Sequence, residues 1–251
     1  MTYEHDQEAR REAADHALSE ADLRQLAAQV AAERTRLGQH GWRGQSISFA
    51  PAKWAELIDG MTVTRAGRIS RGEVFDIAAR GSVVDVFTAS FVWGSGKRGY
   101  GPTRCRTILE LAGTDLERSL GRAASAQDPI AAYAILYGGH DPKQRAPTGD
   151  AAWGRLGGYG PAFFTKFLYF TTPGALILDH RLATAVHRLT KMPYLVTAKG
   201  RSRAWSPYRY AVYLHWMHQT AHRLAVEPDL LELTLFESPP LSAGPGIDRG
   251  Q

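Results

Sequence analysis

LGGYGPAFFTKFLYF, residues 156–170, places three glycines within four positions and then a lysine among aromatic side chains. Glycine permits backbone conformations that other residues avoid, so Gly158 and Gly160 predict a tight two-residue turn. Pro161 suits the first turn of a helix, which we expect to continue to the end of the stretch. The free amides of such a turn, backed by a helix N-terminus, can bind a phosphate. The stretch therefore predicts a hairpin followed by a helix that carries Lys166.

The rest of the chain is typical of an all-α protein. Apolar residues at helical spacing, serine or proline at helix starts and glycine at helix ends recur along it. Beyond one or two helices within 2–37, helices are expected in 48–61, 69–81, 82–94, 102–113, 128–139, 180–191, 206–225 and 228–236. The segment 82–94 is rich in β-branched residues, so a strand is the alternative there. A short strand is expected only near ALIL, residues 175–178.

Length and composition favour a globular domain with flanking segments. The chain has 251 residues, of which 44% are hydrophobic, and this is enough for a substantial core. We expect a helical extension over 1–41, the main domain over 42–236 and a flexible tail over 237–251 that is rich in proline and glycine. A single cysteine, Cys105, excludes a disulfide framework and any cysteine-ligated zinc or iron–sulfur site held by this chain alone.

The first sixteen residues, MTYEHDQEARREAADH, are too polar for a signal peptide, and no apolar run approaches transmembrane length. We therefore expect a cytoplasmic, nucleoid-associated protein without membrane contact.

Positive charge is concentrated in the C-terminal half of the chain. Between His180 and Val226 there is no aspartate or glutamate. The basic residues there are Arg181, Arg188, Lys191, Lys199, Arg201, Arg203, Arg209 and Arg223. Such one-sided charge favours contact with a phosphate backbone, because neutralised phosphates release counterions. The alternative is a solvated basic face without a partner.

The hairpin and its surroundings resemble the helix–hairpin–helix DNA glycosylase superfamily. Its hairpin reads Leu-x-Gly-hydrophobic-Gly, which this chain has as Leu156 to Gly160. In the superfamily an aspartate follows about twenty residues later, and here Asp179 stands nineteen residues after Gly160. The match is close over about 153–186 and looser over 85–102. The whole is most similar to bacterial 8-oxoguanine DNA glycosylase-like proteins, which implies a two-lobed helical fold with a cleft between the lobes.

The resemblance departs from the family pattern at the lysine. Bifunctional members carry a nucleophilic lysine two residues after the second hairpin glycine, where this chain has Ala162. Lys166 lies four residues later, and because four residues are about one helical turn, it projects from nearly the same face. Either Lys166 reaches the same site from one turn further along, or the protein is monofunctional and uses Asp179 with water.

The chemistry of base excision assigns roles to these two residues. Positive charge develops on the sugar as the N-glycosidic bond breaks, and the carboxylate of Asp179 could stabilise it. Asp179 also stands where a plain helix N-cap would. A lysine nucleophile reacts as a free amine, a form that burial among apolar groups favours. The aromatic neighbours of Lys166 offer such burial; the alternative is a lysine that snorkels to the surface.

Further residues are candidates for DNA contact or for lining a base pocket. The glycine-rich loop after 82–94 could wedge into the duplex, and the basic loop before 206–225 could reach the backbone. Alternatively the first is a structural loop, and the aromatics of 206–225 are core. The candidates are Trp93, Lys97, Arg98, Tyr100, Lys199, Arg201, Arg203, Tyr213 and Trp216.

The sequence thus predicts a monomeric enzyme without metal or cofactor. It would excise an oxidised purine, 8-oxoguanine, from double-stranded DNA, with associated lyase activity through a lysine Schiff base. Two alternatives remain: a non-catalytic DNA-binding protein that keeps the hairpin for phosphate contact, and a glycosylase for another modified base.

Overall fold

The computed structural model describes residues 5–59, 67–97, 99–113, 115–137, 159–203 and 205–237, and these are mostly helical. The helices are α1 (Asp6–Asp15), α2 (Glu20–Leu37), α3 (Pro51–Ile58), α4 (Arg71–Arg80), α5 (Val83–Ser95), α6 (Gly101–Ala112), α7 (Asp115–Ala124), α8 (Pro129–Tyr137), α9 (Pro161–Thr171), α10 (His180–Thr190), α11 (Pro207–Arg223) and α12 (Pro228–Glu237). Short 3₁₀ turns at Gly38–His40 (η1) and Trp42–Gly44 (η2) connect α2 to a two-stranded sheet, β1 (Ser46–Ser48) and β2 (Arg68–Ser70). The all-α prediction is confirmed.

Polar side chains begin several of these helices as the sequence predicts. Ser82 accepts a hydrogen bond from the amide of Asp85, whose carboxylate in turn accepts one from the amide of Ser82. This capping box satisfies two amides that a helix start leaves free, so the segment 82–94 is helical rather than a strand. Ser206 is the N-cap of α11, where its hydroxyl oxygen accepts a hydrogen bond from the amide of Arg209.

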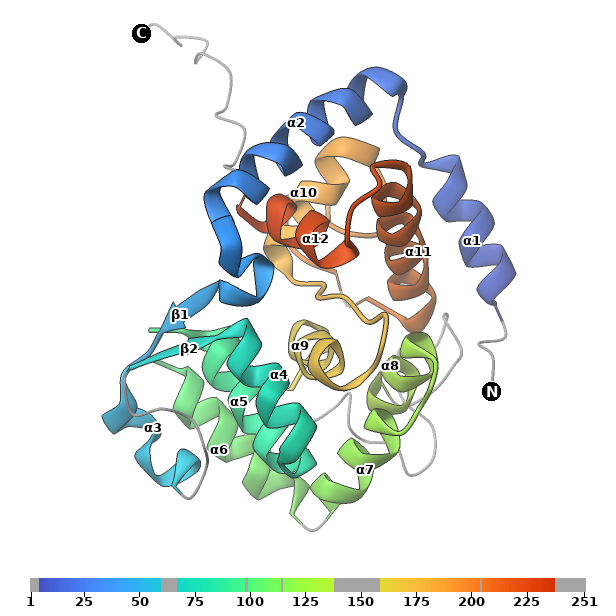
Figure 1. The fold of residues 1–251 in the computed structure, drawn as a ribbon. Coiled ribbons are helices and arrows are strands. Elements are labelled where there is room, and N and C mark those ends of the chain that lie inside the picture. The colour runs from blue at the N-terminus through green and yellow to red at the C-terminus, as the bar shows by residue number, and fades with distance from the viewer. Residues whose placement is uncertain are drawn as a thin grey trace, which may run out of the picture.

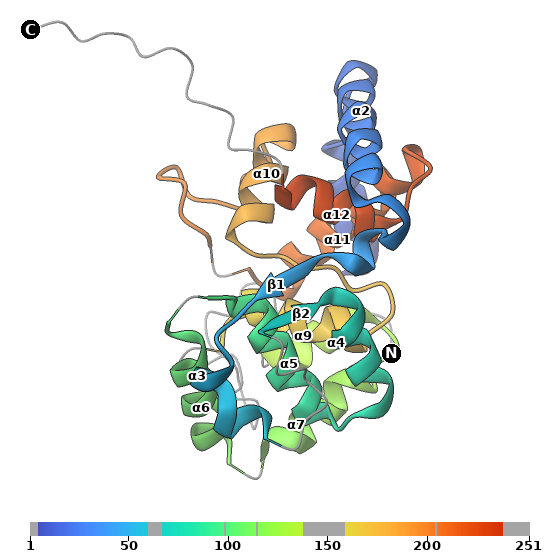
Figure 2. The same ribbon diagram turned by 60° about the vertical axis from the view of Figure 1, so that its left-hand side comes forward.

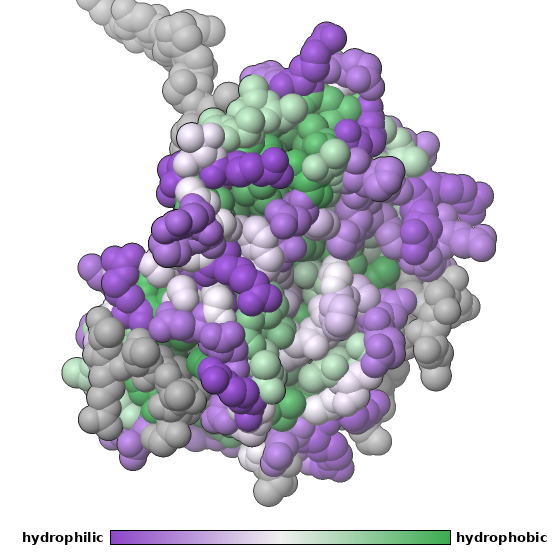
Figure 3. All heavy atoms as spheres, viewed as in Figure 1, coloured by the Kyte–Doolittle hydropathy of each residue, from purple (hydrophilic) through white to green (hydrophobic). Residues whose placement is uncertain are grey.

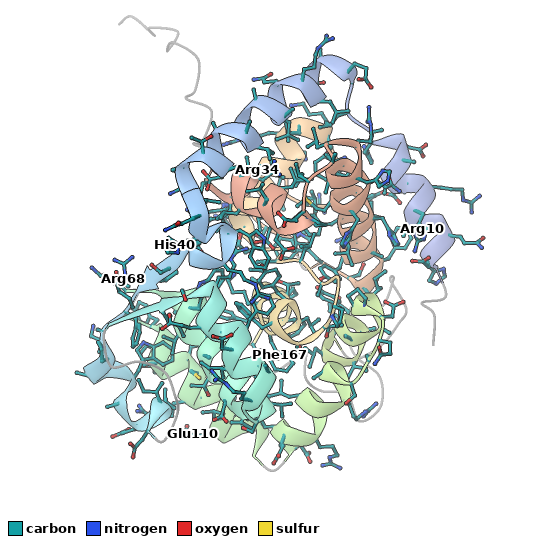
Figure 4. All side chains as sticks on the ribbon, in the orientation of Figure 1. Arg10, Arg34, His40, Arg68, Glu110 and Phe167 are labelled. Carbon is teal, nitrogen blue, oxygen red and sulfur yellow. The ribbon has the colours of Figure 1, made fainter. Side chains whose placement is uncertain are left out.

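The helices form two groups around α9. In Figure 1, α3 to α8 and the sheet make the lower lobe, while α1, α2 and α10 to α12 make the upper lobe; Figure 2 shows the same division. Helix α9 lies between them and packs against α4, α5, α7 and α8. Figure 4 shows Phe167 of α9 among the crowded side chains in the middle of the molecule, whereas Arg10 lies at the periphery. The helix predicted to carry the lysine is therefore central.

The two ends of the described chain build the upper lobe together. Helix α1 packs along α11, where the indole of Trp216 donates to the carbonyl oxygen of His16 at 3.0 Å. The imidazole of His215 lies 2.7 Å from the carboxylate of Asp6. Burial and the charge of Arg10 lower the pKa of His215, against the opposing pull of Asp6. The N-terminal helices therefore pack on the core instead of projecting from it.

Three features differ from the sequence prediction. ALIL, residues 175–178, is not a strand, because its backbone groups bond to side chains instead of to a neighbouring strand. The strands lie elsewhere, in β1 and β2, which pair antiparallel with Ile47 opposite Ile69. These three-residue strands are too short to show an alternating pattern. Helix α7 was also not predicted, although Leu116 and Leu120 face the core at helical spacing.

Candidate active site

Lys166 and Asp179 meet where α9 faces the start of α10. The amine Nζ of Lys166 lies 3.1 Å from Oδ2 of Asp179. The side chains are 9% and 16% exposed, so the pair is largely withdrawn from water but not sealed from it. Residues thirteen positions apart are brought together because the chain turns back after α9 and runs beside it to the start of α10. The sequence predicted both residues, and the structure makes them partners.

Asp179 has two functions in the local structure. Its Oδ1 accepts hydrogen bonds from the amides of Arg181 (3.0 Å) and Leu182 (3.2 Å), which makes it the N-cap of α10. Burial alone raises the pKa of Asp179, but the charge of Lys166 and these hydrogen bonds outweigh it, and the pKa is lowered from its usual value. The predicted N-cap is confirmed, and the same residue holds an ionised carboxylate against the amine.

The side chain of Lys166 extends toward the N-terminus of α9, so that its amine lies beside the turn that contains Ala162. Nζ donates to the carbonyl oxygen of Ala162 at 3.3 Å as well as to Asp179. Side chains on a helix tilt toward its N-terminus, so a long lysine side chain reaches back about one turn. The amine of Lys166 therefore lies at the turn of Ala162, although its Cα stands four residues further along the helix. The alternative of a lysine that snorkels to the surface does not describe this buried side chain.

Gly94 borders Lys166 and was missed by the sequence reasoning, whereas Phe163 is one of the predicted aromatic neighbours. A β-carbon on Gly94, near the end of α5, would lie 2.5 Å from Cδ of Lys166, so the lysine stem occupies the space that this glycine leaves. The ring of Phe163 stacks on Phe91 with centroids 3.9 Å apart, and Nζ of Lys166 lies 5.8 Å from the Phe163 centroid. A glycine inside an otherwise helical stretch was the available signal for Gly94.

The predicted hairpin falls only partly within the described residues. Leu156, Gly157 and Gly158 lie outside them. Tyr159 is buried against Phe87 and other core aromatics, so its side chain is structural. Gly160 is the N-cap of α9 with φ −117° and ψ 177°, an extended backbone that any residue adopts, so the predicted conformational need for glycine there is wrong. A β-carbon on Gly160 would have no atom of the described residues within 4 Å, so crowding by those residues does not require glycine at this position.

The loop after α5 separates into a buried and an exposed part. Trp93 is 6% exposed and packs edge-on against Phe170, with the guanidinium of Arg71 5.1 Å from its ring centroid. The prediction that Trp93 wedges into DNA or lines a base pocket is therefore not supported, because its ring is part of the core. Lys97 is exposed, and Tyr100 is 83% exposed. Arg98 lies outside the described residues.

The basic loop between α10 and α11 is tied to the start of α10. Its side chains Lys199, Arg201 and Arg203 are exposed, and the hydroxyl of Ser202 lies 2.9 Å from Nδ1 of His180, the residue after Asp179. Figure 2 shows this connection, in orange, standing out from the upper lobe. The predicted basic patch is therefore anchored beside the Lys166–Asp179 pair.

Two aromatics predicted as pocket-lining candidates belong to the core. Tyr213 is fully buried and donates its hydroxyl to the carbonyl oxygen of Ile177 at 2.5 Å. Trp216 is 1% exposed and holds α1 in place. Neither ring has surface to offer to a base, so the core alternative describes both.

A cavity of about 780 Å³ lies within the upper lobe, between α2, α10 and the end of α12. In Figure 3, green apolar surface gathers in this lobe around α2, bordered by purple hydrophilic residues. His180 and Arg181 line the cavity, but Lys166 and Asp179 do not. This cavity is therefore separate from the candidate active site, and the expected cleft between the lobes stays a prediction.

Among the described residues, no group of three or more histidine, cysteine, aspartate or glutamate side chains is arranged to hold a metal ion. None of the described helices is both long and apolar enough to cross a bilayer.

Comparison with known proteins adds the family. Residues 40–236 match the model of a family described as "Putative 8-oxoguanine DNA glycosylase OGG-like protein". No curated protein and no solved structure matches the chain. The match covers the lower lobe, α9 and the basic half of the chain, including the Lys166–Asp179 pair. The chain therefore belongs to the 8-oxoguanine DNA glycosylase OGG-like family.

Proposed function

We propose that this protein excises 8-oxoguanine from double-stranded DNA and then cleaves the strand through a Schiff base on Lys166. The observation that carries the proposal is the 3.1 Å approach of the Lys166 amine to the Asp179 carboxylate, at the margin of the core. Membership of a DNA glycosylase-like family implies DNA binding and directs the chemistry toward the N-glycosidic bond. The family description also suggests 8-oxoguanine as the base.

The proposed reaction divides the work between the two side chains. The bond between the base and C1′ breaks, the base leaves with the bonding electrons, and the ionised Asp179 stabilises the positive charge on the sugar. Lys166 passes one proton to the carboxylate of Asp179, the acceptor already in contact, and its free amine then forms the new bond to C1′. The departed base takes up the proton that Asp179 received. The nitrogen passes a second proton to the ring oxygen as the bond between C1′ and that oxygen breaks, which gives the Schiff base that permits strand cleavage.

Exposed groups around the pair supply the proposed DNA contacts. Lys97 and Tyr100 follow α5, whose end borders Lys166 at Gly94. The basic loop of Lys199, Arg201 and Arg203 is tied to the residue after Asp179. We propose that the basic loop contacts phosphates, that Tyr100 fills the gap left by the flipped nucleotide, and that the protein acts as a monomer.

Base release from defined duplexes tests this function. Wild-type protein should release the base from a duplex with one 8-oxoguanine, and not from the undamaged duplex. Asp179→Asn should lose release about a hundred-fold or more, because the charge on the sugar is no longer stabilised. Asp76→Asn, on the exposed face of α4, is the matched control and should stay active. If the protein releases only a different modified base, the proposed substrate is wrong. If it releases no base from any damaged duplex, the enzyme proposal fails and a non-catalytic DNA-binding protein remains.

A monofunctional mechanism is the second candidate, and the ion pair itself favours it. Lys166 pairs with a carboxylate at 3.1 Å, and a lysine ammonium held in such a pair is not a nucleophile until it gives up a proton. In this mechanism water attacks C1′, and Lys166 only orients Asp179. Base release without a covalent intermediate would identify it.

A further inference from the structure

The four residues before Asp179 form a buried segment without a neighbouring strand among the described residues. Ala175, Leu176, Ile177 and Leu178 are each at most 4% exposed, and they are not part of a helix or sheet. Buried amide and carbonyl groups cost free energy when they lack hydrogen-bond partners. The hydrogen bonds made by the backbone of residues 175–178 therefore also determine the position of Asp179.

Side chains from two C-terminal helices supply several of these bonds. The hydroxyl of Tyr210 accepts from the amide of Leu176 (3.3 Å) and donates to its carbonyl oxygen (3.0 Å). The carbonyl oxygen of Ile177 accepts from Tyr213 (2.5 Å), and its amide donates to Glu232 (2.8 Å). Both tyrosines and Glu232 are at most 1% exposed, so water does not replace these bonds.

Thr165 on α9 supplies the bond closest to Asp179. Its hydroxyl oxygen accepts from the amide of Leu178 at 3.0 Å and lies 3.3 Å from the carbonyl oxygen of the same residue. Thr165 immediately precedes Lys166, and Leu178 immediately precedes Asp179. The hydrogen bond between Thr165 and Leu178 therefore joins the two residues that directly precede Lys166 and Asp179. A small shift in this bond would change the distance between the amine and the carboxylate.

The arrangement is also anchored to the lower lobe. Glu232 forms a buried ion pair with Arg71 of α4 at 3.1 Å, and Arg71 donates to the hydroxyl of Tyr169 on α9 at 3.0 Å. Helices α4, α9 and α12 are thereby linked through side chains that are almost fully buried. The segment is held from both lobes and has little freedom to move alone.

We propose that Thr165 is a positioning residue for the reaction at Lys166 and Asp179, and that Tyr210, Tyr213 and Glu232 support it by fixing residues 175–178. The inference rests on the proposed function. None of the four touches the substrate; together they set the separation between amine and carboxylate. A misplacement of about 1 Å costs up to about a hundred-fold in rate, so the chemical step is the quantity they govern.

Single-turnover kinetics on an 8-oxoguanine duplex test the proposal. Thr165→Val keeps the shape and removes the acceptor of the Leu178 amide; we expect about a ten-fold to hundred-fold slower excision. Affinity for a duplex with an uncleavable abasic-site analogue should stay within about two-fold, because only the chemical step changes. Thr165→Ser, which keeps the hydroxyl, should restore the rate. The control is Thr234→Val, which removes another buried threonine hydroxyl, bonded to Leu230 in α12.

A second readout does not depend on activity. In a carbon-13 NMR titration, the signal of the Asp179 carboxylate is assigned by its absence in Asp179→Asn. Thr165→Val should raise the pKa of Asp179 from its lowered value, because the amine of Lys166 is no longer held next to the carboxylate. Thr234→Val should leave that pKa unchanged. If the wild type releases no base, the proposed function fails and this titration alone decides the positioning role.

If Thr165→Val does not fold, Tyr213→Phe replaces it, with Tyr133→Phe as control. The hydroxyl of Tyr133 donates to the carbonyl oxygen of Trp205 and not to residues 175–178, and phenylalanine keeps the ring that stacks on Tyr210. Tyr213→Phe should then show the slower excision and the raised pKa of Asp179, and Tyr133→Phe neither. Equal losses in the test and control variants, or a test variant with unchanged rate and pKa, would overturn the proposal.

Discussion

Lys166 and Asp179 each make a second bond that fixes the side chain before any substrate arrives. The amine donates to the carbonyl oxygen of Ala162, and the carboxylate accepts from the amides of Arg181 and Leu182. Groups already held in place lose little freedom on reaching a transition state. The resemblance to the glycosylase superfamily pointed to both residues, but not to the way Lys166 bends back to Ala162, which depends on the packing around its stem.

Asp179→Asn should make the protein less stable at neutral pH. The pKa of Asp179 is lowered from its usual value of 3.8, so at a pH above 3.8 the ionised carboxylate stabilises the folded state. This stabilisation is lost as the pH falls through the lowered pKa. Asparagine still caps α10 but leaves the buried amine without a counter-charge, which should cost about 1–3 kcal/mol in the free energy of unfolding. Urea denaturation at several pH values should show the difference narrowing below 3.8. A constant difference down to acidic pH would mean that the ion pair contributes nothing.

Gly94→Ala should impair excision without destabilising the fold. Alanine favours a helix over glycine by about 1 kcal/mol, yet its β-carbon would lie 2.5 Å from Cδ of Lys166 and displace the lysine stem. We expect the excision rate to fall about ten-fold or more, with a melting temperature near that of the wild type. Gly121→Ala on α7 is the control, because a β-carbon there meets no atom within 4 Å. Wild-type rates in Gly94→Ala would show that the position of the stem is unimportant.

At the scale of elements, helix α9 was predictable and the segment after it was not. Pro161 and the aromatic residues indicated a helix directly from the sequence, and it extends over Pro161–Thr171. ALIL, residues 175–178, has the composition of a strand, but its hydrogen-bond partners come from residues up to 55 positions away, such as Glu232. Local pattern cannot reveal side-chain partners that only the tertiary fold brings near.

The start of α9 gives a prediction for DNA binding. Gly160 has an ordinary extended backbone, and no atom of the described residues lies within 4 Å of a β-carbon placed there, so neither backbone strain nor crowding by those residues explains glycine. Close approach of a phosphate would explain it. Gly160→Ala should keep the free energy of unfolding within about 1 kcal/mol of the wild type, because lower freedom of the unfolded chain and a poorer N-cap residue oppose each other, while it weakens affinity for duplex DNA. Unchanged affinity in a fluorescence-anisotropy titration would remove Gly160 from the proposed interface.

At the scale of the molecule, helix α1, which carries more acidic than basic residues, packs onto the basic helix α11. Arg223 donates to the carbonyl oxygen of Leu18 and pairs with Glu20 at 2.7 Å, so part of the positive charge read from the sequence serves the fold. The exposed basic loop remains for a polyanion. Helix starts and the all-α class could be predicted from local signals, and the two catalytic candidates from the resemblance to a known superfamily. The packing of α1 on α11, some two hundred residues apart, could not.

The central claim is that Lys166 acts as the nucleophile beside Asp179, and borohydride trapping tests it most directly. Wild-type protein incubated with an 8-oxoguanine duplex and borohydride should form a covalent adduct, and mass spectrometry should locate it on the peptide that contains Lys166. Lys166→Gln should give no adduct, whereas Lys53→Gln, which changes an exposed lysine of α3, should react like the wild type. An adduct that persists in Lys166→Gln, or base release by the wild type without any adduct, would contradict the claim.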